Sequence, residues 1–252
     1  MIKYLVNYTK RILKNIRFRN EFNTFLRLAS QKNNRFSVKW RDRYPCLDDN
    51  TPNTAFDRHY VYHTSWAARI LAKTRPEYHV DISSDLRFAT LVSAFVPIRF
   101  YDYRPANLNL DNLILERANI TRLCFEDQSI ASLSCMHVVE HIGLGRYGEP
   151  LDYEGDLKAI AELNRVLAIE GDLIFVVPIG QPRILFNAHR IYCYEQVIEY
   201  FRDLKLVEFA LIPDHINENG LIKNASQTFA DEQSYACGCF WFKNVHCPNA
   251  IE

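Results

Sequence analysis

The sequence lacks any apolar run that approaches the ~20 residues needed to cross a bilayer, so no segment reads as a membrane span. Charged residues interrupt the first positions every few residues, and the apolar centre of a signal peptide is therefore also missing. Glycine is scarce, with 8 in the chain and none before Gly143. From the first two absences we expect a protein that is retained in the cytoplasm.

The seven cysteines also lack the spacing of a metal site. Cys237 and Cys239 form the one close pair, in a strand-like run where a period of two points both side chains to the same face. A zinc site would need a second pair or a histidine cluster, and neither stands near this pair in the sequence. We therefore predict buried free thiols in a reducing compartment, and no metal.

Charge is balanced overall but unevenly distributed. Residues 1–45 hold 12 Lys/Arg and 2 Asp/Glu, a net charge of +10, so the rest of the chain carries −10. Apolar residues recur among these charges at helical spacing, which predicts a basic amphipathic helix. Two interpretations stay open: attachment to an anionic membrane surface or acidic partner, and packing on the acidic remainder of the chain. Nucleic acid is not expected, because no recognised motif accompanies the charge.

Two short apolar runs, at 78–82 and 96–101, organise the rest of the chain. Asp81 lies in the first, and Asp102 follows the second, 21 positions later. Between them, residues 86–95 have the periodicity of a short helix. Strand, helix and strand ending in an acid form the first half of a dinucleotide-type unit, in which the second acid accepts hydrogen bonds from ribose hydroxyls.

The same kind of pattern predicts the other elements. After an irregular connection over 31–58, we expect helices at 60–73, 156–167 and 194–201, and strands at 117–123, 130–139, 173–178, 204–212 and 234–243. Residues 215–233 are predicted to be a polar loop. This order predicts an α/β fold: a Rossmann-like, mostly parallel seven-stranded sheet with an antiparallel closing strand pair, plus an N-terminal helical extension. We divide the chain into a basic extension and linker, 1–55, and a main domain, 56–252.

Several of these segments resemble motifs of class I S-adenosylmethionine-dependent methyltransferases. HVDISS (79–84) resembles their first motif, and YDYRP (101–105) their second, acidic one. SCMHVVEHI (134–142) resembles the fourth-strand motif of the subgroup that acts on sugars, quinones and lipids. Residues 157–178 closely resemble the fifth motif. The resemblance covers 56–243. YDYRP together with EHIGLGRYG (140–148) is most similar to a poorly characterised branch associated with bacterial surface-polysaccharide genes.

The resemblance implies S-adenosylmethionine as cofactor and transfer of its methyl group to a hydroxyl of a sugar or glycan intermediate. The cofactor-binding residues that it implies are Asp81, Ser83, Ser84, Asp102, Tyr103, Asn119, Ile120 and His137. The acceptor would meet residues of two later loops, namely Arg146, Tyr147, His189 and Arg190.

Methyl transfer to a hydroxyl needs a base, and His137, Glu140 and His141 are the candidates. Packing of His137 beneath the cofactor, with Glu140 capping a turn, is the structural alternative. The sequence Gly143-Leu-Gly-Arg-Tyr-Gly148 matches the G-x-G-x-x-G pattern, but Glu149-Pro150 follows it, so no helix begins there. We therefore predict a loop at the carboxyl end of a strand rather than a phosphate cradle.

One departure from the resemblance favours a second hypothesis. The family's first motif has glycines after the acid, whereas this chain has Ser83, Ser84 and Asp85 there. Asp85 adds a negative charge near the expected place of the cofactor's carboxylate. Asn119 likewise replaces an acid on the third strand. The alternative function is thus a non-catalytic binding or scaffold protein of the same fold, which could also be peripheral on the inner face of a membrane.

Overall fold

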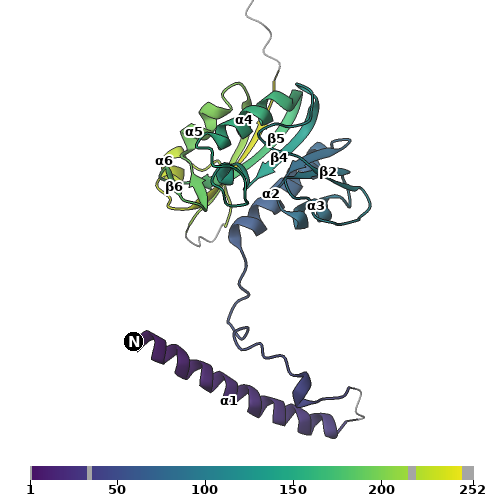
Figure 1. Cartoon of the computed structure of the whole chain (residues 1–252), viewed down its shortest axis with the longest axis vertical. Helices are drawn as coiled ribbons and strands as arrows, with labels where there is room; N and C mark the ends of the chain where they lie inside the picture. Colours follow the sequence, from purple (N-terminus) through teal and green to yellow (C-terminus); the bar gives the residue numbers. More distant parts are fainter. Residues whose placement is uncertain (1, 33–35, 215–219, 246–252) are drawn as a thin grey trace, which may run out of the picture. The chain divides into compact units, whose positions relative to one another are not determined.

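The computed structural model describes residues 2–32, 36–214 and 220–245. The chain forms two compact units, Met1–Phe56 and Asp57–Glu252 (Figure 1). No helix of the described residues is long and apolar enough to cross a membrane. Each unit is described by itself.

The N-terminal unit is built on α1 (Ile2–Ser30), the helix predicted from the apolar spacing. The segment after it returns alongside the helix through the short 3-10 turn η1 (Trp40–Asp42). The rings of Phe18 and Phe22 lie 6.1 and 4.9 Å from that of Trp40, and Lys14 pairs with Asp48 at 2.5 Å. Other large apolar side chains of α1 remain exposed, among them Leu13, Ile16, Phe25 and Leu28.

The globular unit begins with α2 (Arg58–Thr74), which confirms the helix predicted at 60–73. The Asp57 side chain caps it by accepting a hydrogen bond from the Tyr60 N–H. The helix ends at Arg75, which adopts a left-handed conformation (φ 48°) directly before Pro76. Trp66, Ile70 and Leu71 are buried, so α2 covers the sheet rather than standing free.

A mixed sheet forms the centre of the globular unit. Parallel strands β1 (His79–Ile82), β2 (Ile98–Asp102), β3 (Leu113–Arg117), β4 (Ile130–Met136) and β5 (Leu167–Ile179) are followed by antiparallel β10 (Ala236–Lys243), β8 (Lys205–Ile212) and β9 (Ile222–Lys223). Their spatial order is β3-β2-β1-β4-β5-β10-β8-β9. The mostly parallel sheet and its antiparallel closing pair are thus confirmed, with the two-residue β9 added at the edge.

Helices cover both faces of this sheet (Figure 1). α2 and α3 (Leu86–Val92) lie on one face, and α4 (Gly155–Val166), α5 (Tyr194–Tyr200) and α6 (Gln227–Asp231) lie on the other. In β5, Phe175 and Val177 pack toward α4, while Ile174 and Val176 pack toward α2. A strand buried on both faces needs an uninterrupted apolar sequence, which is why this one could be predicted.

Three boundary predictions are wrong. The third strand is 113–117, not 117–123, because the Asn119 side-chain oxygen Oδ1 accepts hydrogen bonds from the Thr121 N–H and hydroxyl and turns the chain. The predicted fourth strand ends at Met136, since His137 is left-handed (φ 56°). The fifth strand begins at Leu167, six residues before the predicted 173–178, directly after the helix predicted at 156–167, which is α4.

Two further features differ from the sequence-based expectation. The described part of the polar loop predicted at 215–233 contains β9 and α6, and residues 215–219 lie outside the described residues. A hairpin of β6 (Arg183–Leu185) and β7 (His189–Ile191), which was not predicted, follows β5. Its turn lies at the carboxyl end of β5, where the candidate site also lies.

Candidate functional site

Two adjoining cavities open at the carboxyl ends of the parallel strands, where α/β proteins place their ligands. The smaller, of about 230 Å³, is lined by the loops that follow β1 to β4. The larger, of about 730 Å³, is lined by the start of α2, the loop after β4 and the β6–β7 turn. Ser83 and Tyr147 line both cavities, so a bound molecule could extend from one into the other.

A buried polar network shapes the loop after β1. Asp81 accepts hydrogen bonds from the Ser84 N–H (3.0 Å) and the Ser134 hydroxyl (2.5 Å). Since that hydroxyl donates to Asp81, it accepts from His79 Nε2 (2.8 Å), and His79 Nδ1 accepts from Ser132 (2.7 Å). Burial raises the pKa of Asp81 to about 6 and lowers that of His79 to about 3. Asp81 therefore holds the loop and lines neither cavity.

The residues that replace the expected glycines have defined contacts. Ser83 is left-handed (φ 54°), a conformation that glycine adopts without strain, and its hydroxyl donates to the Tyr101 carbonyl. The Ser84 hydroxyl accepts from the Met136 N–H. Asp85 caps α3 and pairs with Arg87 at 2.7 Å. Burial acts to raise the Asp85 pKa, but hydrogen bonds from Arg87 outweigh it and lower the pKa, so a cation accompanies this carboxylate.

The smaller cavity brings together side chains from three strand ends. Tyr103, Asn119 and Ile120 line it, as does Ser83. The Asn119 oxygen is used by Thr121, so its amide nitrogen is the group left to donate. Asp102 closes β2 just before Tyr103, and its Oδ1 accepts the Arg104 N–H at 2.6 Å. It is not among the lining residues, although its neighbour Tyr103 is.

A histidine–carboxylate pair lies at the base of the larger cavity. His137 Nδ1 is 2.8 Å from Glu140 Oε1, and both side chains are buried. Burial raises the pKa of Glu140 to about 7 and lowers that of His137 to about 4. When Glu140 is ionised it can only accept, so His137 Nδ1–H then donates to it and His137 Nε2 carries a lone pair.

His141 borders the same cavity with a different set of contacts. Its Nδ1–H donates to the Ala188 carbonyl at 2.6 Å, so its Nε2 carries the lone pair. That nitrogen is 3.8 Å from Glu140 Oε1. Burial lowers the His141 pKa, so the ring is neutral at pH 7 and able to accept a proton.

The glycine loop, residues 143–150, lies between the two cavities and is held by the carboxylate of Glu149. Gly143, Gly145 and Gly148 all have positive φ, between 71° and 86°. The Glu149 carboxylate accepts the N–H groups of Gly145 (2.8 Å) and Tyr147 (2.9 Å). α4 begins only at Gly155, so the predicted loop is confirmed and the N–H groups that a phosphate would need are occupied.

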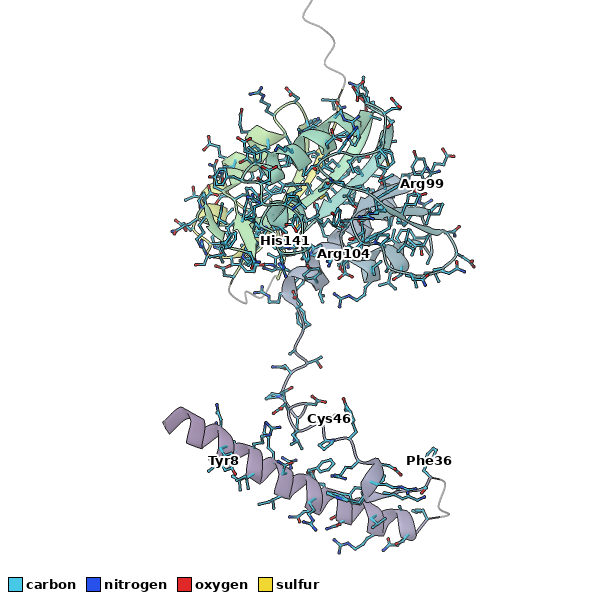
Figure 2. The ribbon with its side chains drawn as sticks, in the orientation of Figure 1. Tyr8, Phe36, Cys46, Arg99, Arg104 and His141 are labelled. Atoms are coloured by element: carbon cyan, nitrogen blue, oxygen red, sulfur yellow. The ribbon has the colours of Figure 1, made fainter. Side chains whose placement is uncertain are left out.

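Cations and a histidine surround the Tyr147 ring. Arg104 lies 4.9 Å and Arg146 5.2 Å from its centroid, and His141 meets it edge-on at 5.9 Å. Arg104 and His141 are labelled in Figure 2. The ring thus ties the loop after β2 to the loop after β4, and Arg146 also lines the larger cavity.

The two residues predicted after the fifth strand lie in different surroundings. His189 lines the larger cavity and stacks on Tyr235 at 4.7 Å. Arg190 is only 4% exposed, and its guanidinium donates to the carbonyls of Ile142 (2.7 Å) and Tyr153 (2.9 Å). Its Nε is 3.4 Å from Asp156. Arg190 is thus outside both cavities, and its contacts hold the segments around them.

The wall of the larger cavity that α2 and β10 contribute was not predicted from the sequence. His59, Tyr60 and Tyr235 line the larger cavity, yet the sequence indicated only a helix and a closing strand there. His59 and His137 also lie beside Cys237, so the expectation that no histidine cluster accompanies this cysteine is wrong. No spacing in the sequence relates residues 59, 137 and 237, because they meet only through the sheet topology.

The buried titratable groups predict that acid destabilises the globular unit. Burial lowers the pKa of six described histidines, including His141 and His189, and it does so most strongly for four of them. Below pH 6.5 the unfolded chain therefore binds protons that the folded chain does not, above all at His59, His63, His79 and His137. Asp81 and Glu140 act in the opposite direction on the free energy of unfolding, since their raised pKa values make the folded state hold up to two protons more strongly. The histidines outnumber them. Between pH 6 and 4 the free energy of unfolding should therefore fall, by roughly 1–3 kcal/mol per pH unit.

Urea unfolding at pH 7 and pH 5 measures this directly. The unfolding midpoint should be lower at pH 5, with an unchanged slope. A midpoint that stays constant or rises at pH 5 would show that these histidines are charged in the folded protein.

Comparisons with known proteins agree on the fold. A family model described as "Caenorhabditis protein of unknown function, DUF268" matches residues 124–208, which include β4, the glycine loop, α4, β5 and α5. No curated protein sequence matches the chain significantly.

Solved structures match much more of the chain. The N-methyltransferase NodS from Bradyrhizobium japonicum WM9, in complex with S-adenosyl-L-homocysteine, is similar over 82% of this chain and 92% of its own, with 15% identity and a TM-score of 0.53. The Burkholderia thailandensis 1,6-didemethyltoxoflavin-N1-methyltransferase, with its toxoflavin precursor and S-adenosylhomocysteine, is similar over 73% of this chain and 79% of its own, with 10% identity and a TM-score of 0.52. The chain therefore has the Rossmann-like fold of class I S-adenosylmethionine-dependent methyltransferases.

Proposed function

We propose that the protein is an S-adenosylmethionine-dependent methyltransferase that methylates a hydroxyl of a sugar or glycan intermediate. One observation carries the proposal: the loops after β1, β2, β3 and β4 together line the smaller cavity, and four residues implied by the family resemblance are among them. Ser83, Tyr103, Asn119 and Ile120 come from three separate loops, which the parallel strands bring to the same end of the sheet.

The residues present fit such a cofactor. Tyr103 and Ile120 offer aromatic and apolar surface for an adenine ring, and the Asn119 amide nitrogen can donate to it. We assign Asp102, which ends β2 directly before the lining residue Tyr103, to the ribose hydroxyls. Asp85 does not oppose the cofactor's carboxylate with an unpaired charge, because Arg87 accompanies it.

The larger cavity supports a polar acceptor. Its wall carries histidines, tyrosines and the guanidinium of Arg146, which are groups that hydrogen-bond hydroxyls or stack on a sugar face. When bound, the cofactor supplies an electrophilic methyl group. Methyl transfer to a hydroxyl releases one proton, and we assign His141 Nε2 as the base that takes it. Glu140, 3.8 Å away, then faces the imidazolium and stabilises its charge.

An acceptor panel tests this function. The full chain is incubated with methyl-labelled S-adenosylmethionine and either sugar nucleotides and free sugars, or amines and carboxylic acids. We expect label in a sugar methyl ether, which resists base hydrolysis. Label in an amine or ester would replace the proposed acceptor class, and no transfer by protein that binds the cofactor would favour the scaffold alternative.

A second, independent role concerns the N-terminal unit. Exposed apolar side chains such as Leu13 and Ile16 lie beside basic ones along α1, so the helix can offer both to an anionic membrane surface. We propose such peripheral attachment for residues 1–45. The chain should float with vesicles that contain anionic lipid and should be released by high salt or by removal of residues 1–30. Flotation that survives this truncation would contradict the proposal.

A further inference from the structure

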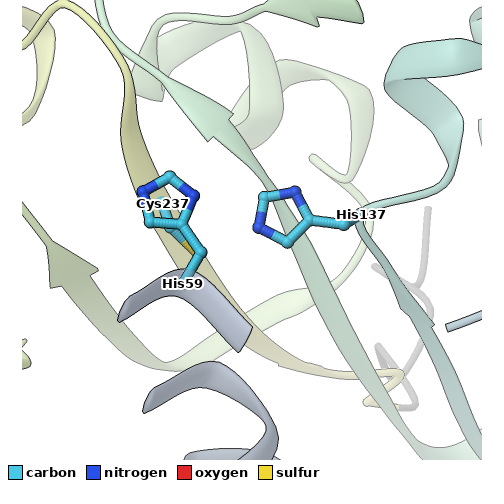
Figure 3. A group of neighbouring side chains, drawn as sticks. All are labelled: His59, His137 and Cys237. Carbon is cyan, nitrogen blue, oxygen red and sulfur yellow. The ribbon is translucent and has the colours of Figure 1, made fainter. Parts of the chain in front are cut away.

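Three side chains with metal-binding atoms meet at the wall of the larger cavity. His59 comes from α2, His137 from the end of β4 and Cys237 from β10, and Figure 3 shows these neighbouring side chains. One ligand atom from each lies within 4.8 Å of the other two. Cys237 and His137 are buried and His59 is half-buried, so such a site would be shielded from bulk solvent on one side and open to the cavity on the other.

His137 is already oriented as metal-binding histidines are. Its Nδ1 lies 2.8 Å from Glu140 Oε1, and when Nδ1–H donates to the ionised carboxylate, Nε2 carries the lone pair. Nε2 is buried, and it has no hydrogen-bond partner among the residues that the structure describes. A buried imidazole nitrogen without a partner costs free energy, and a bound ion would remove that cost.

His59 and Cys237 complete the set on either side of this ring. The His59 ring lies 5.5 Å from that of His137, nearly parallel to it, and it lines the larger cavity. The Cys237 thiol is fully buried beside Cys239, with 3.9 Å between the sulfurs. Burial holds the Cys237 pKa well above its usual value, so a metal would have to displace the thiol proton in order to bind.

We propose that His59, His137 and Cys237 bind a divalent transition metal ion of the zinc class, with a fourth coordination position open to the larger cavity. Imidazole and thiolate ligands favour zinc and its neighbours over magnesium and calcium, which prefer oxygen ligands. In a tetrahedral site with bonds of about 2.0–2.3 Å the ligand atoms are about 3.5 Å apart, so each pair of ligand atoms would close in by about 1.3 Å at most.

Three protein ligands and one open position are typical of a catalytic rather than a structural zinc site. An ion here would lie where an oxygen of a molecule in the larger cavity could reach it and be polarised. Metal binding itself does not depend on methyl transfer, so this proposal stands or fails separately from the proposed function.

Cobalt titration of the full chain tests the proposal. The protein is purified without a histidine tag, kept reduced and stripped of metal with a chelator, and Co²⁺ is then added. We expect one equivalent to bind, with the visible absorption of tetrahedral cobalt and a thiolate-to-cobalt charge-transfer band, and with release of one proton from the thiol. Octahedral cobalt, or binding without the thiolate band, would overturn the proposal.

Matched variants assign the ligands. Cys237→Ser should abolish the charge-transfer band, whereas Cys239→Ser, two residues along the same strand, should keep it. His59→Asn, at the half-buried start of α2, should weaken cobalt binding at least tenfold. This variant tests the site even if the cysteine substitutions in β10 prevent folding. Glu140→Gln should weaken binding about 10- to 100-fold. Loss of the band in Cys239→Ser, or its retention in Cys237→Ser, would contradict the assignment.

Discussion

Replacing His141 with glutamine should lower the rate of methyl transfer about 10²- to 10⁴-fold, the usual contribution of a positioned general base. Its Nδ1–H donates to Ala188, and Nε2 carries the lone pair that takes the acceptor's proton. Glutamine can keep the contact to Ala188 but cannot accept the proton. The measurement is kcat and kcat/KM with the acceptor found in the panel.

The pH profile separates a base from a positioning residue. Burial lowers the pKa of His141, so the wild-type rate should fall in acid only below pH 6.5, and this limb should vanish in His141→Gln. His189→Gln, in the same cavity, is the matched control and should keep the limb while changing mainly KM. An unchanged pH profile in His141→Gln would assign the base to another group.

Replacing Arg190 with methionine should destabilise the globular unit by about 3–5 kcal/mol. Arg190 is the buried partner of Asp156, whose other oxygen accepts the Tyr192 hydroxyl at 2.9 Å. It also satisfies the carbonyls of Ile142 and Tyr153. The substitution therefore leaves a buried carboxylate and two backbone acceptors without this partner, and each unpaired group carries a desolvation cost.

Arg202→Met is the control for this prediction. Arg202 pairs with Glu199 at 2.9 Å, but both side chains are more than 60% exposed, so its loss should cost less than about 1 kcal/mol. Urea unfolding of both variants gives the comparison. A change of less than about 1 kcal/mol for Arg190→Met would show that water replaces its contacts and that Arg190 is available for other roles.

The parts of the fold that follow local rules could be predicted from the sequence. β5 is apolar throughout because both of its faces are covered, and α4 before it has one apolar stripe. β3 was misplaced because it lies at the lateral edge of the sheet, where Leu113 is buried but Ile114 is 53% exposed, and its apolar run of three residues is too short to mark a strand.

Some residues of the candidate site could also be predicted from the sequence, and others could not. Ser83, Tyr103 and Asn119 could be grouped in advance, because parallel strands bring the loops at their carboxyl ends to one edge. His59 and Cys237 could not, because they reach the same edge from a helix start and an antiparallel strand. Arg190 was misjudged for another reason: its position after β5 was correct, but only the packing around it reveals which partners it has.

Calorimetric titration of the full chain with S-adenosylhomocysteine tests the central claim most directly, since it needs no acceptor. We expect one saturable site, weakened about 100-fold in Asp102→Ala through loss of charged hydrogen bonds to the ribose. Asp111 is an exposed aspartate just before β3, at the amino ends of the parallel strands and therefore away from the cavities. Asp111→Ala should bind like the wild type. Absence of binding by folded protein at millimolar ligand would contradict the cofactor site and leave a scaffold of methyltransferase fold.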